Sequence, residues 1–264
     1  MKVTVFTSNQ PRHIALIHRL ATVADEVFAV LECNTVFPGQ VQDFFKRTNV
    51  MQEYFRHVIE AERMVFGSLD FLPSNVRSLS LRSGDLSLLD MSALVAAFQS
   101  DYYIVFGSSY IRNELADFLV EHQAINIHMG VSPYYRGNSC NFWALYDRKP
   151  DYVGATIHLL SKGLDSGAML FHAVPAEQAV DPFELGMLAV RAAQNGLLQA
   201  LKTGELLKMV PVLQDKSLQI RYTRNSDFND DVASGYLRSL PGKNDIGRAL
   251  RDRDVGLLLR PYIE

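Results

Sequence analysis

The sequence predicts an α/β protein built on a doubly wound, mostly parallel sheet of the Rossmann-like type. Short, continuous apolar runs recur along the chain, segments with helical spacing separate them, and turn-forming residues follow the runs. Continuous apolar runs are typical of parallel strands that are buried on both faces. A regular alternation of such strands with helices is typical of a doubly wound sheet.

The first hundred residues contain two expected strands and several helical segments. Strands are predicted at residues 3–6 and 27–31, and helical spacing covers residues 14–20, 41–65 (with a break near Thr48) and 88–98. Cys33 lies at the end of the second apolar run, so we expect it in the core.

The next hundred residues continue the alternation. Strands are predicted at 102–106, 124–128, 155–160 and 168–174, and helices at 113–120 and from Asp181 to about Lys202. A tight turn around residues 163–167 is expected to join the last two strands. Asp181 followed by Pro182 is a typical helix start, because an aspartate caps well and proline fits the first helical position.

The density of apolar residues falls after residue 205. We therefore predict a main domain over residues 1–205 and a small α+β appendage over residues 206–264, with a short strand at 218–222 and charged helical pieces.

The composition is that of a soluble globular protein of 264 residues, with 48% hydrophobic and 21% charged residues. The net charge of −3 gives no general attraction to nucleic acid, whose binding is dominated by phosphate neutralisation.

The start of the chain has no export signal, and no apolar stretch approaches the roughly 20 residues that cross a bilayer. We expect a cytoplasmic protein with no membrane contact. Its two cysteines and scattered histidines predict no metal site.

Three polar residues follow predicted strands in positions suited to chemistry. Asn126 and His128 are two positions apart at a strand end, so both side chains point to one face. An amide and an imidazole placed together can stabilise an oxygen that gains negative charge. Asp165 lies in a glycine-flanked turn, and a carboxylate near a histidine would orient it, raise its pKa and accept a proton.

Each of these residues alone also has an ordinary structural explanation. A single histidine at a strand end is more often a surface or satisfied core residue, Asn126 suits a turn, and Asp165 suits a hairpin connection. The combination of several motifs in one order is more specific. The motifs are Asn-Ile-His at 126–128, Pro-Tyr-Tyr-Arg-Gly at 133–137, Trp-Ala-Leu at 143–145, Gly-Ala-Thr-Ile-His at 154–158 and Gly-Leu-Asp-Ser-Gly at 163–167.

This order and spacing resembles the folate-dependent formyltransferases, which include enzymes acting on glycinamide ribonucleotide, methionyl-tRNA and nucleotide-linked amino sugars. The clear match covers about residues 102–175, and the strand–helix order extends it to residues 1–205, which would then be the catalytic domain. The resemblance implies transfer of a formyl group from 10-formyltetrahydrofolate to an amine. It implies that Asn126 and His128 stabilise the oxyanion and that Asp165 positions His128 and helps to move the proton of the amine.

The resemblance also implies where the two substrates bind. The folate donor is expected between two loops, at Ser108, Ser109, Tyr110, Ile111, Lys162, Gly163 and Leu164. The acceptor is expected at Asn9, Tyr135 and Arg136. The chain departs from its relatives after His128, where they commonly carry Ser-Leu-Leu-Pro and this chain has Gly-Val-Ser-Pro at residues 130–133. The segment at 41–66 is also more helical than the second-strand region of these relatives.

The acceptor remains open at this stage. The short C-terminal appendage and the net charge disfavour methionyl-tRNA, and the sequence after the first strand lacks the glycine-rich phosphate loop of glycinamide ribonucleotide enzymes. A small amine remains, and nucleotide-linked amino sugars fit best. Residues 218–224 resemble the start of a tail that aids dimerisation in relatives of that class, so the resemblance implies a homodimer. A formyltetrahydrofolate hydrolase and a non-catalytic binding module with this fold are the alternatives.

Overall fold

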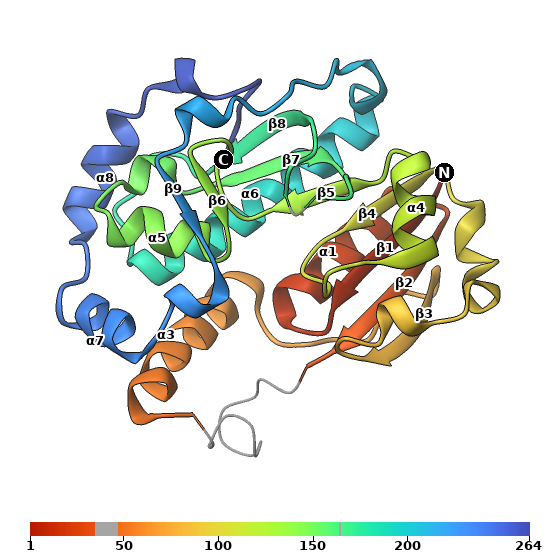
Figure 1. Ribbon diagram of the computed structural model, residues 1–264, viewed down its shortest axis with the longest axis horizontal. Coiled ribbons are helices and arrows are strands. Elements are labelled where there is room, and N and C mark those ends of the chain that lie inside the picture. Colours follow the sequence, from red (N-terminus) through yellow and green to blue (C-terminus); the bar gives the residue numbers. More distant parts are fainter. Residues whose placement is uncertain (35–46, 164) are drawn as a thin grey trace.

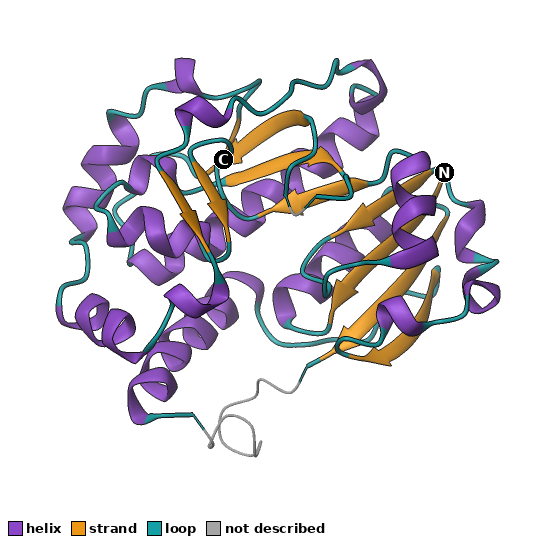
Figure 2. Cartoon of the chain, viewed as in Figure 1, coloured by secondary structure: helices purple, strands orange, loops and turns teal. Residues whose placement is uncertain are grey.

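The computed structural model describes residues 1–34, 47–163 and 165–264, and its main feature is an eight-stranded mixed sheet with helices around it (Figures 1 and 2). The order of the eight strands is β10-β8-β7-β5-β4-β1-β2-β3. Their bounds are β1 Lys2–Ser8, β2 Glu26–Cys33, β3 Val76–Arg82, β4 Tyr102–Val105, β5 Ile125–His128, β7 Ala155–Leu159, β8 Met169–Val174 and β10 Tyr262–Ile263. Only β7 runs antiparallel to its neighbours, β5 and β8. The mostly parallel sheet confirms the predicted fold class.

Helices cover both faces of this sheet, which makes it doubly wound. Helices α1 (Pro11–Ala21) and α6 (Pro182–Thr203) pack on one face, where Val3 and Val5 of β1 join their apolar side chains. Helix α4 (Asn113–Glu121) packs on the other face, where Phe6 of β1 and Val105 of β4 meet Leu115. The alternation of side chains along β1 therefore supplies both cores.

A third core lies beside the sheet. Helices α3 (Asn49–Phe66), α5 (Cys140–Tyr146), α7 (Asp230–Arg238) and α8 (Lys243–Arg251) gather there, together with a two-stranded pair of β6 (Tyr135–Gly137) and β9 (Arg221–Thr223) (Figure 1). The ring of Tyr54 on α3 meets the rings of Phe142, Phe183 and Phe228 at centroid distances of 5.8, 5.3 and 4.9 Å. This aromatic cluster joins elements from both halves of the sequence.

Several local predictions are confirmed. The expected strands at 102–106, 124–128, 155–160 and 168–174 correspond to β4, β5, β7 and β8. Helix α6 begins after Asp181, whose carboxylate accepts the backbone hydrogen of Phe183 at 2.9 Å. Helix α3 begins after Thr48, whose hydroxyl accepts from Met51 at 3.2 Å, and the part of the expected 41–65 helical region before residue 47 lies outside the described residues.

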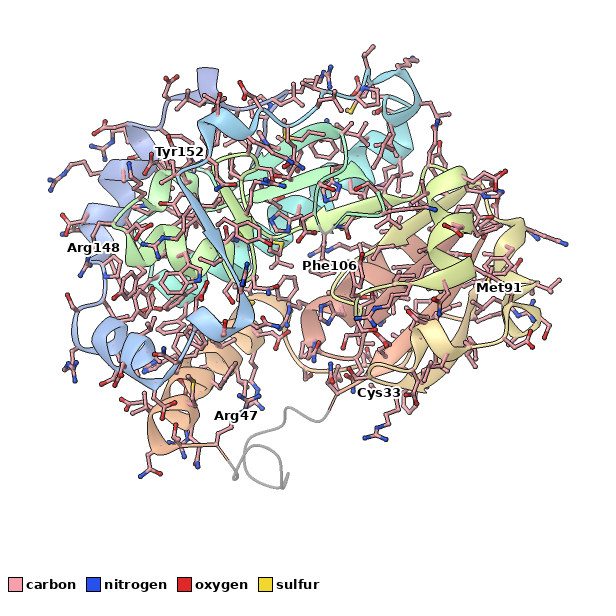
Figure 3. The ribbon with its side chains drawn as sticks, viewed as in Figure 1. Cys33, Arg47, Met91, Phe106, Arg148 and Tyr152 are labelled. Carbon is pink, nitrogen blue, oxygen red and sulfur yellow. The ribbon has the colours of Figure 1, made fainter. Side chains whose placement is uncertain are left out.

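Other local predictions are wrong. Residues 88–98 do not form an α-helix; three short 3₁₀ turns at Leu86–Leu88, Met91–Leu94 and Ala97–Gln99 replace it. The backbone of Leu89 and Asp90 is extended, and the Asp90 side chain caps a new turn by accepting from Ser92. Cys33, expected in the core, is exposed at the end of β2 (Figure 3).

The tail differs from the expectation in where its strands lie. The strand expected at 218–222 begins later, as β9, and β10 was not expected at all. Because β10 pairs with β8, the last residues of the chain complete one edge of the main sheet. Across the residues that the structure describes, none of the helices has the length and hydrophobicity needed to span a membrane.

Candidate active site

The carboxyl ends of β1, β4 and β5 meet where the order of the strands reverses. From β1 the chain proceeds to β2 and β3 on one side, then returns to β4 on the other side of β1. Loops that leave neighbouring parallel strands in opposite directions open a crevice at such a point, and ligands of doubly wound sheets bind there. His128 ends β5 at this edge, and the turn between β7 and β8 carries Asp165 beside it.

The three residues expected to perform catalysis are in contact. His128 Nδ1 lies 3.3 Å from Asp165 Oδ2, and Asn126 Nδ2 donates to Asp165 Oδ1 at 3.3 Å. All three belong to one hydrogen-bonded cluster although Asp165 is far from the other two along the chain. The exposed fractions of the His128 and Asp165 side chains are only 7% and 17%, so this cluster is largely removed from water.

The charges of this cluster support each other. Burial lowers the pKa of His128, but the Cys140 sulfur and the Asp165 carboxylate raise that pKa by more, to a value above the ordinary range of histidine. Burial raises the pKa of Asp165, but His128, with help from His158 and Asn126, brings that pKa below its ordinary value. Both shifts favour an imidazolium next to a carboxylate at neutral pH.

His158 extends the cluster on its other side. His158 pairs with Asn126 across β7 and β5, and its Nε2 lies 3.0 Å from Asn126 Nδ2. His158 Nδ1 lies 2.8 Å from the carbonyl oxygen of Leu159, which can only accept. Nδ1 therefore carries the hydrogen and Nε2 is free to accept from Asn126. Burial lowers the pKa of His158 to about 4, in agreement with a neutral ring.

A pocket of about 710 Å³ opens above this cluster. Asn126, His128, His158 and Asp165 line it on one side, and residues of the loop after β4 line it on the other. Its further lining residues include Val105, Phe106, Ser108, Ser109, Tyr110, Ile111, Met129, Leu160 and Gly163. Phe106 lies near the middle of the molecule, where β4 ends (Figure 3). Apolar walls with a few polar groups at one end are typical of a site for a flat organic ligand.

The buried carboxylate of Glu32 shapes the loop after β4. Glu32 is 1% exposed at the end of β2, and it accepts hydrogen bonds from the backbone and the hydroxyl of Ser109, the latter at 2.8 Å. It also accepts from the backbone of Gly84 at 2.8 Å. These bonds tie the loop to the neighbouring strand, so the wall of the pocket is held in place by a charged group beneath it.

Not every residue expected to bind the donor reaches this pocket. Ser108, Ser109, Tyr110, Ile111 and Gly163 line it, whereas the Lys162 side chain points to Asp117 at 2.6 Å and is 72% exposed. The carbonyl of Lys162 accepts from the Tyr110 hydroxyl at 2.8 Å. Leu164 lies outside the described residues.

The residues expected to bind the acceptor are not brought to the catalytic cluster. Tyr135 is 1% exposed and donates its hydroxyl to Asp147 at 3.1 Å, and Arg136 is buried and donates to Gln219 at 3.3 Å. The side-chain oxygen of Asn9 accepts from the backbone of Asn34 at 2.9 Å. In this structure their side chains hold the protein together, and their contact with an acceptor stays a prediction.

A smaller pocket of about 290 Å³ adjoins the first one. Met129, which follows His128 in the chain, and Ser139 line both pockets, so the two pockets lie side by side near His128. The lining of the smaller pocket comes from α1, α3, α5, α6 and α7 and includes Arg12, Tyr54, Phe142, Phe183, Met187 and Tyr236. Arg12 is held by the buried carboxylate of Glu62 at 2.7 Å. The structure thus offers two adjoining binding spaces around one catalytic cluster.

Sequence reasoning missed three members of this arrangement: Glu32, Cys140 and His158. A charged residue at the end of an apolar run was a usable signal for Glu32. His158 lies inside the Gly-Ala-Thr-Ile-His motif at 154–158, but its contact with Asn126 follows only from the pairing of β7 with β5. Within the described part of the chain, no three His, Cys, Asp or Glu side chains are grouped as metal ligands would be.

Comparison with known proteins places this geometry in a family. Residues 1–184 match the model of the family described as Formyl transferase. The chain belongs to this family.

Two curated formyl transferase relatives are methionyl-tRNA formyltransferases. The one from Synechococcus sp. (strain JA-3-3Ab) is 28% identical over 132 residues, which is 48% of this chain and 40% of that protein. The one from Anaeromyxobacter sp. (strain K) is 31% identical over 128 residues, 47% of this chain and 40% of that protein. The chain therefore spans less than half the length of these two relatives.

Solved formyl transferase structures share the fold. A 4-N formyltransferase from Francisella tularensis superposes with a TM-score of 0.54 at 15% identity, over 86% of this chain and 77% of that one. The formyltransferase PseJ from Anoxybacillus kamchatkensis, solved with UDP-4,6-dideoxy-4-formamido-L-AltNAc and tetrahydrofolate, superposes with a TM-score of 0.50 at 16% identity. That superposition covers 94% of this chain and all of the PseJ chain. At these identities the likeness concerns the fold.

Proposed function

We propose that this formyl transferase moves a formyl group from 10-formyltetrahydrofolate to the primary amine of a nucleotide-linked amino sugar. The observation that carries the proposal is the contact between His128, Asp165 and Asn126 at the floor of a pocket large enough for the donor. The family supplies the reaction class. The solved relatives bound to nucleotide sugars support the class of acceptor.

The donor pocket fits a folate. Its apolar walls, which include Ile111 and Met129, suit a flat ring, and the backbone of the loop held by Glu32 offers fixed polar groups at its edge. When bound there, the donor supplies an activated formyl carbonyl. The chain's own residues then have to orient this carbonyl, stabilise its oxygen and move one proton.

The cluster can perform these tasks. The protonated ring of His128 donates a hydrogen bond to the formyl oxygen as that oxygen gains negative charge. Asp165 keeps the ring oriented and protonated, and it accepts the proton of the attacking amine, directly or through water. Both hydrogens of Asn126 Nδ2 are used inside the cluster, on His158 and Asp165. Donation from Asn126 to the formyl oxygen therefore requires one of these two bonds to open, and His128 becomes the main donor.

The smaller aromatic pocket is the place for the acceptor. It adjoins the donor pocket at Met129 and Ser139, so an amine that enters from it arrives next to His128. Its aromatic walls suit the apolar face of a sugar or a base. Replacing Tyr54 by alanine should raise the KM for the acceptor and leave the binding of folate unchanged. An equal effect on both substrates would contradict this placement.

Two measurements test the proposed function. Titration calorimetry with 5-formyltetrahydrofolate, followed by UDP and dTDP, should give saturable binding of the folate and of one nucleotide. With the matching amino sugar, His128→Asn and Asp165→Asn should each lower kcat at least ~100-fold, the scale expected for lost stabilisation of the oxyanion or lost proton transfer. A folded protein that binds no folate would overturn the proposal.

Methionyl-tRNA is the second candidate acceptor, because the two curated relatives are methionyl-tRNA formyltransferases. The same assay with charged initiator tRNA separates the two candidates. Formylation of the tRNA without formylation of any nucleotide sugar would identify methionyl-tRNA as the acceptor. Formate release with neither acceptor would indicate the hydrolase, and folate binding without turnover would indicate a binding module.

We also propose that residues 206–264 act as an appendage through which two copies associate. The segment exposes apolar side chains, with Leu207 78% and Leu213 81% exposed. Light scattering coupled to gel filtration should give the mass of a dimer, and Leu213→Asp should give that of a monomer. A wild-type protein that elutes as a monomer at all concentrations would refute this arrangement.

A further inference from the structure

Cys140 contacts the catalytic histidine from the side opposite Asp165. It is the first residue of α5, its side chain is 1% exposed, and its Sγ lies 3.5 Å from His128 Nε2. The same Sγ lies 3.2 Å from the carbonyl oxygen of Gly137. The ring of His128 is therefore held between a carboxylate at Nδ1 and a sulfur at Nε2.

The directions of these hydrogen bonds follow from their two ends. The carbonyl of Gly137 can only accept, and at 3.2 Å it is closer to the sulfur than His128 Nε2 is, so we assign the thiol hydrogen of Cys140 to it. A lone pair of the sulfur then remains to accept from His128 Nε2. At the other end, the ionised carboxylate of Asp165 can only accept from Nδ1. Both ring nitrogens of His128 therefore carry a hydrogen, which is the form that an oxyanion needs.

We propose that Cys140 is a positioning residue for His128. In the resting site its sulfur accepts a hydrogen bond from Nε2, and during transfer Nε2 donates this hydrogen bond to the formyl oxygen instead. This inference rests on the proposed function of the cluster. Sulfur suits the task because it is a weak acceptor, sufficient to hold the ring yet easily replaced by an oxygen that carries negative charge.

Gly130 provides the space for this contact. A Cβ atom at residue 130 would lie 2.5 Å from the Cβ of Cys140, 3.0 Å from its Sγ and 2.9 Å from His128 Nε2. Distances below 3 Å cannot be accommodated without movement. The glycine at 130 is one of the positions at which this chain departs from the Ser-Leu-Leu-Pro of its relatives. A side chain at residue 130 would therefore displace Cys140 or His128, so the contact between them depends on this glycine.

Among the described residues, the charged and titratable groups that face the ring come from three elements. Asp165 approaches from the turn after β7, Cys140 from α5, and His158 from β7 itself, with its ring centroid 6.4 Å from that of His128. His158 is neutral, so replacing Cys140 removes an acceptor from His128 and leaves Asp165 as its only charged partner among these groups.

The test follows the protonation of His128 by nitrogen NMR of the full chain labelled with ¹⁵N-histidine, in Cys140→Ala and Cys140→Ser. Loss of the acceptor in Cys140→Ala should move the titration midpoint of His128 down by at least about 0.5 pH unit, because a hydrogen bond to the charged form favours it. Cys140→Ser keeps both a donor and an acceptor, so its midpoint should stay nearer to that of the wild type. His122, which is exposed at the end of α4, reports in the same spectra that the fold is intact.

Transfer kinetics and a double substitution complete the test. Cys140→Ala should lower kcat roughly 10-fold while the KM for the donor stays within about twofold, as is typical for a group that orients another. Gly130→Ser alone should lower kcat more than Gly130→Ser combined with Cys140→Gly does, because the second change removes the Cβ atom with which the new side chain collides. An unchanged midpoint in Cys140→Ala overturns the positioning role. The NMR result does not need turnover, so failure of the proposed function, seen as absent folate binding, is distinguishable from it.

Discussion

Asn126 donates one hydrogen of its side-chain amide to His158 Nε2 over 3.0 Å, and this bond decides which way the amide faces. The Nδ1 hydrogen of His158 is fixed on the carbonyl of Leu159, so only Nε2 can accept. With its nitrogen directed to His158 and Asp165, Asn126 presents its oxygen elsewhere. A histidine outside the expected trio thus orients one of its members.

Removal of this acceptor should impair turnover more than substrate binding. In His158→Leu the amide of Asn126 loses one of its two partners, so we expect kcat to fall about 10-fold to 100-fold, the range seen when orienting groups around a reactive site are removed. The KM for the folate donor should change little. His158→Gln places a carbonyl oxygen near the position of Nε2 and should recover most of the rate. Equal losses in both variants would show that His158 fills space only.

Loss of the Glu32 carboxylate should weaken folate binding specifically. In Glu32→Gln one oxygen becomes an amide nitrogen, so Ser109 loses an acceptor in either orientation of the amide: for its backbone N–H at Oε2, or for its hydroxyl, together with the Gly84 N–H, at Oε1. We expect the Kd for 5-formyltetrahydrofolate, measured by calorimetry, to rise at least about 10-fold, in line with roughly 1.5–3 kcal/mol for a hydrogen bond to a charged group.

Glu62→Gln is the matched control for this experiment. Glu62 is also a buried carboxylate, but its partner is Arg12, which lines the smaller pocket. The affinity for folate should stay at the wild-type value in this variant while the KM for the acceptor rises. Similar losses of folate affinity in both variants would mean that any change of a buried carboxylate loosens the whole site.

Gly137 permits the close approach of β6 to β9. Its φ is +90°, and a Cβ atom there would lie 2.0 Å from the carbonyl oxygen of Thr223. Gly137→Ala should therefore lower the free energy of unfolding in urea by at least about 2 kcal/mol, because both the backbone and the strand contact are strained. Gly235→Ala in α7 meets nothing within 4 Å and should stabilise the protein by up to about 1 kcal/mol. The prediction fails if the two alanines have the same effect.

The fold was largely predictable from the sequence because its main signals are local. Buried parallel strands appear as continuous apolar runs, and the start of α6 is marked by Asp181 and Pro182. The amphipathic spacing at residues 88–98 was misleading, because the capping side chain of Asp90 favours a new turn over a continuous helix. The two-residue strand β10 carries no local signal, since its pairing with β8 depends on the return of the chain end to the sheet.

The candidate site was predictable only where a motif names a residue. Asn126, His128 and Asp165 are in contact as expected, but their alignment depends on the pairing of β5 with the hairpin of β7 and β8. The Cys140 contact depends on the loop between β5 and α5, and no spacing rule places that sulfur next to His128. Tyr135 and Arg136 lie inside a motif, yet Tyr135 of β6 packs into the third core and Arg136 donates to Gln219, because a motif does not specify which way side chains point.

Two buried histidines should make the protein sensitive to acid. Burial lowers the pKa of His158 and of His172 to about 4, whereas both titrate near 6.5 in the unfolded chain. Between these values the unfolded state binds more protons than the folded state. The free energy of unfolding therefore falls as the pH drops from about 6.5 towards 4, and it is unaffected by these groups above that window.

His172 isolates this effect better than His158, because Thr156 of β7 separates it from His128 in the sheet. It lies on β8, is 1% exposed, and its Nδ1 accepts the backbone hydrogen of Leu259 at 2.9 Å. Asparagine can keep that hydrogen bond without a titrating ring. Between pH 7.5 and pH 5.0, the free energy of unfolding in urea should therefore fall by about 2 kcal/mol more in the wild type than in His172→Asn. His122→Asn at the exposed end of α4 should show the wild-type loss. If His172→Asn also loses as much stability as the wild type, His172 is protonated within the folded protein and the assignment of its neutral state is wrong.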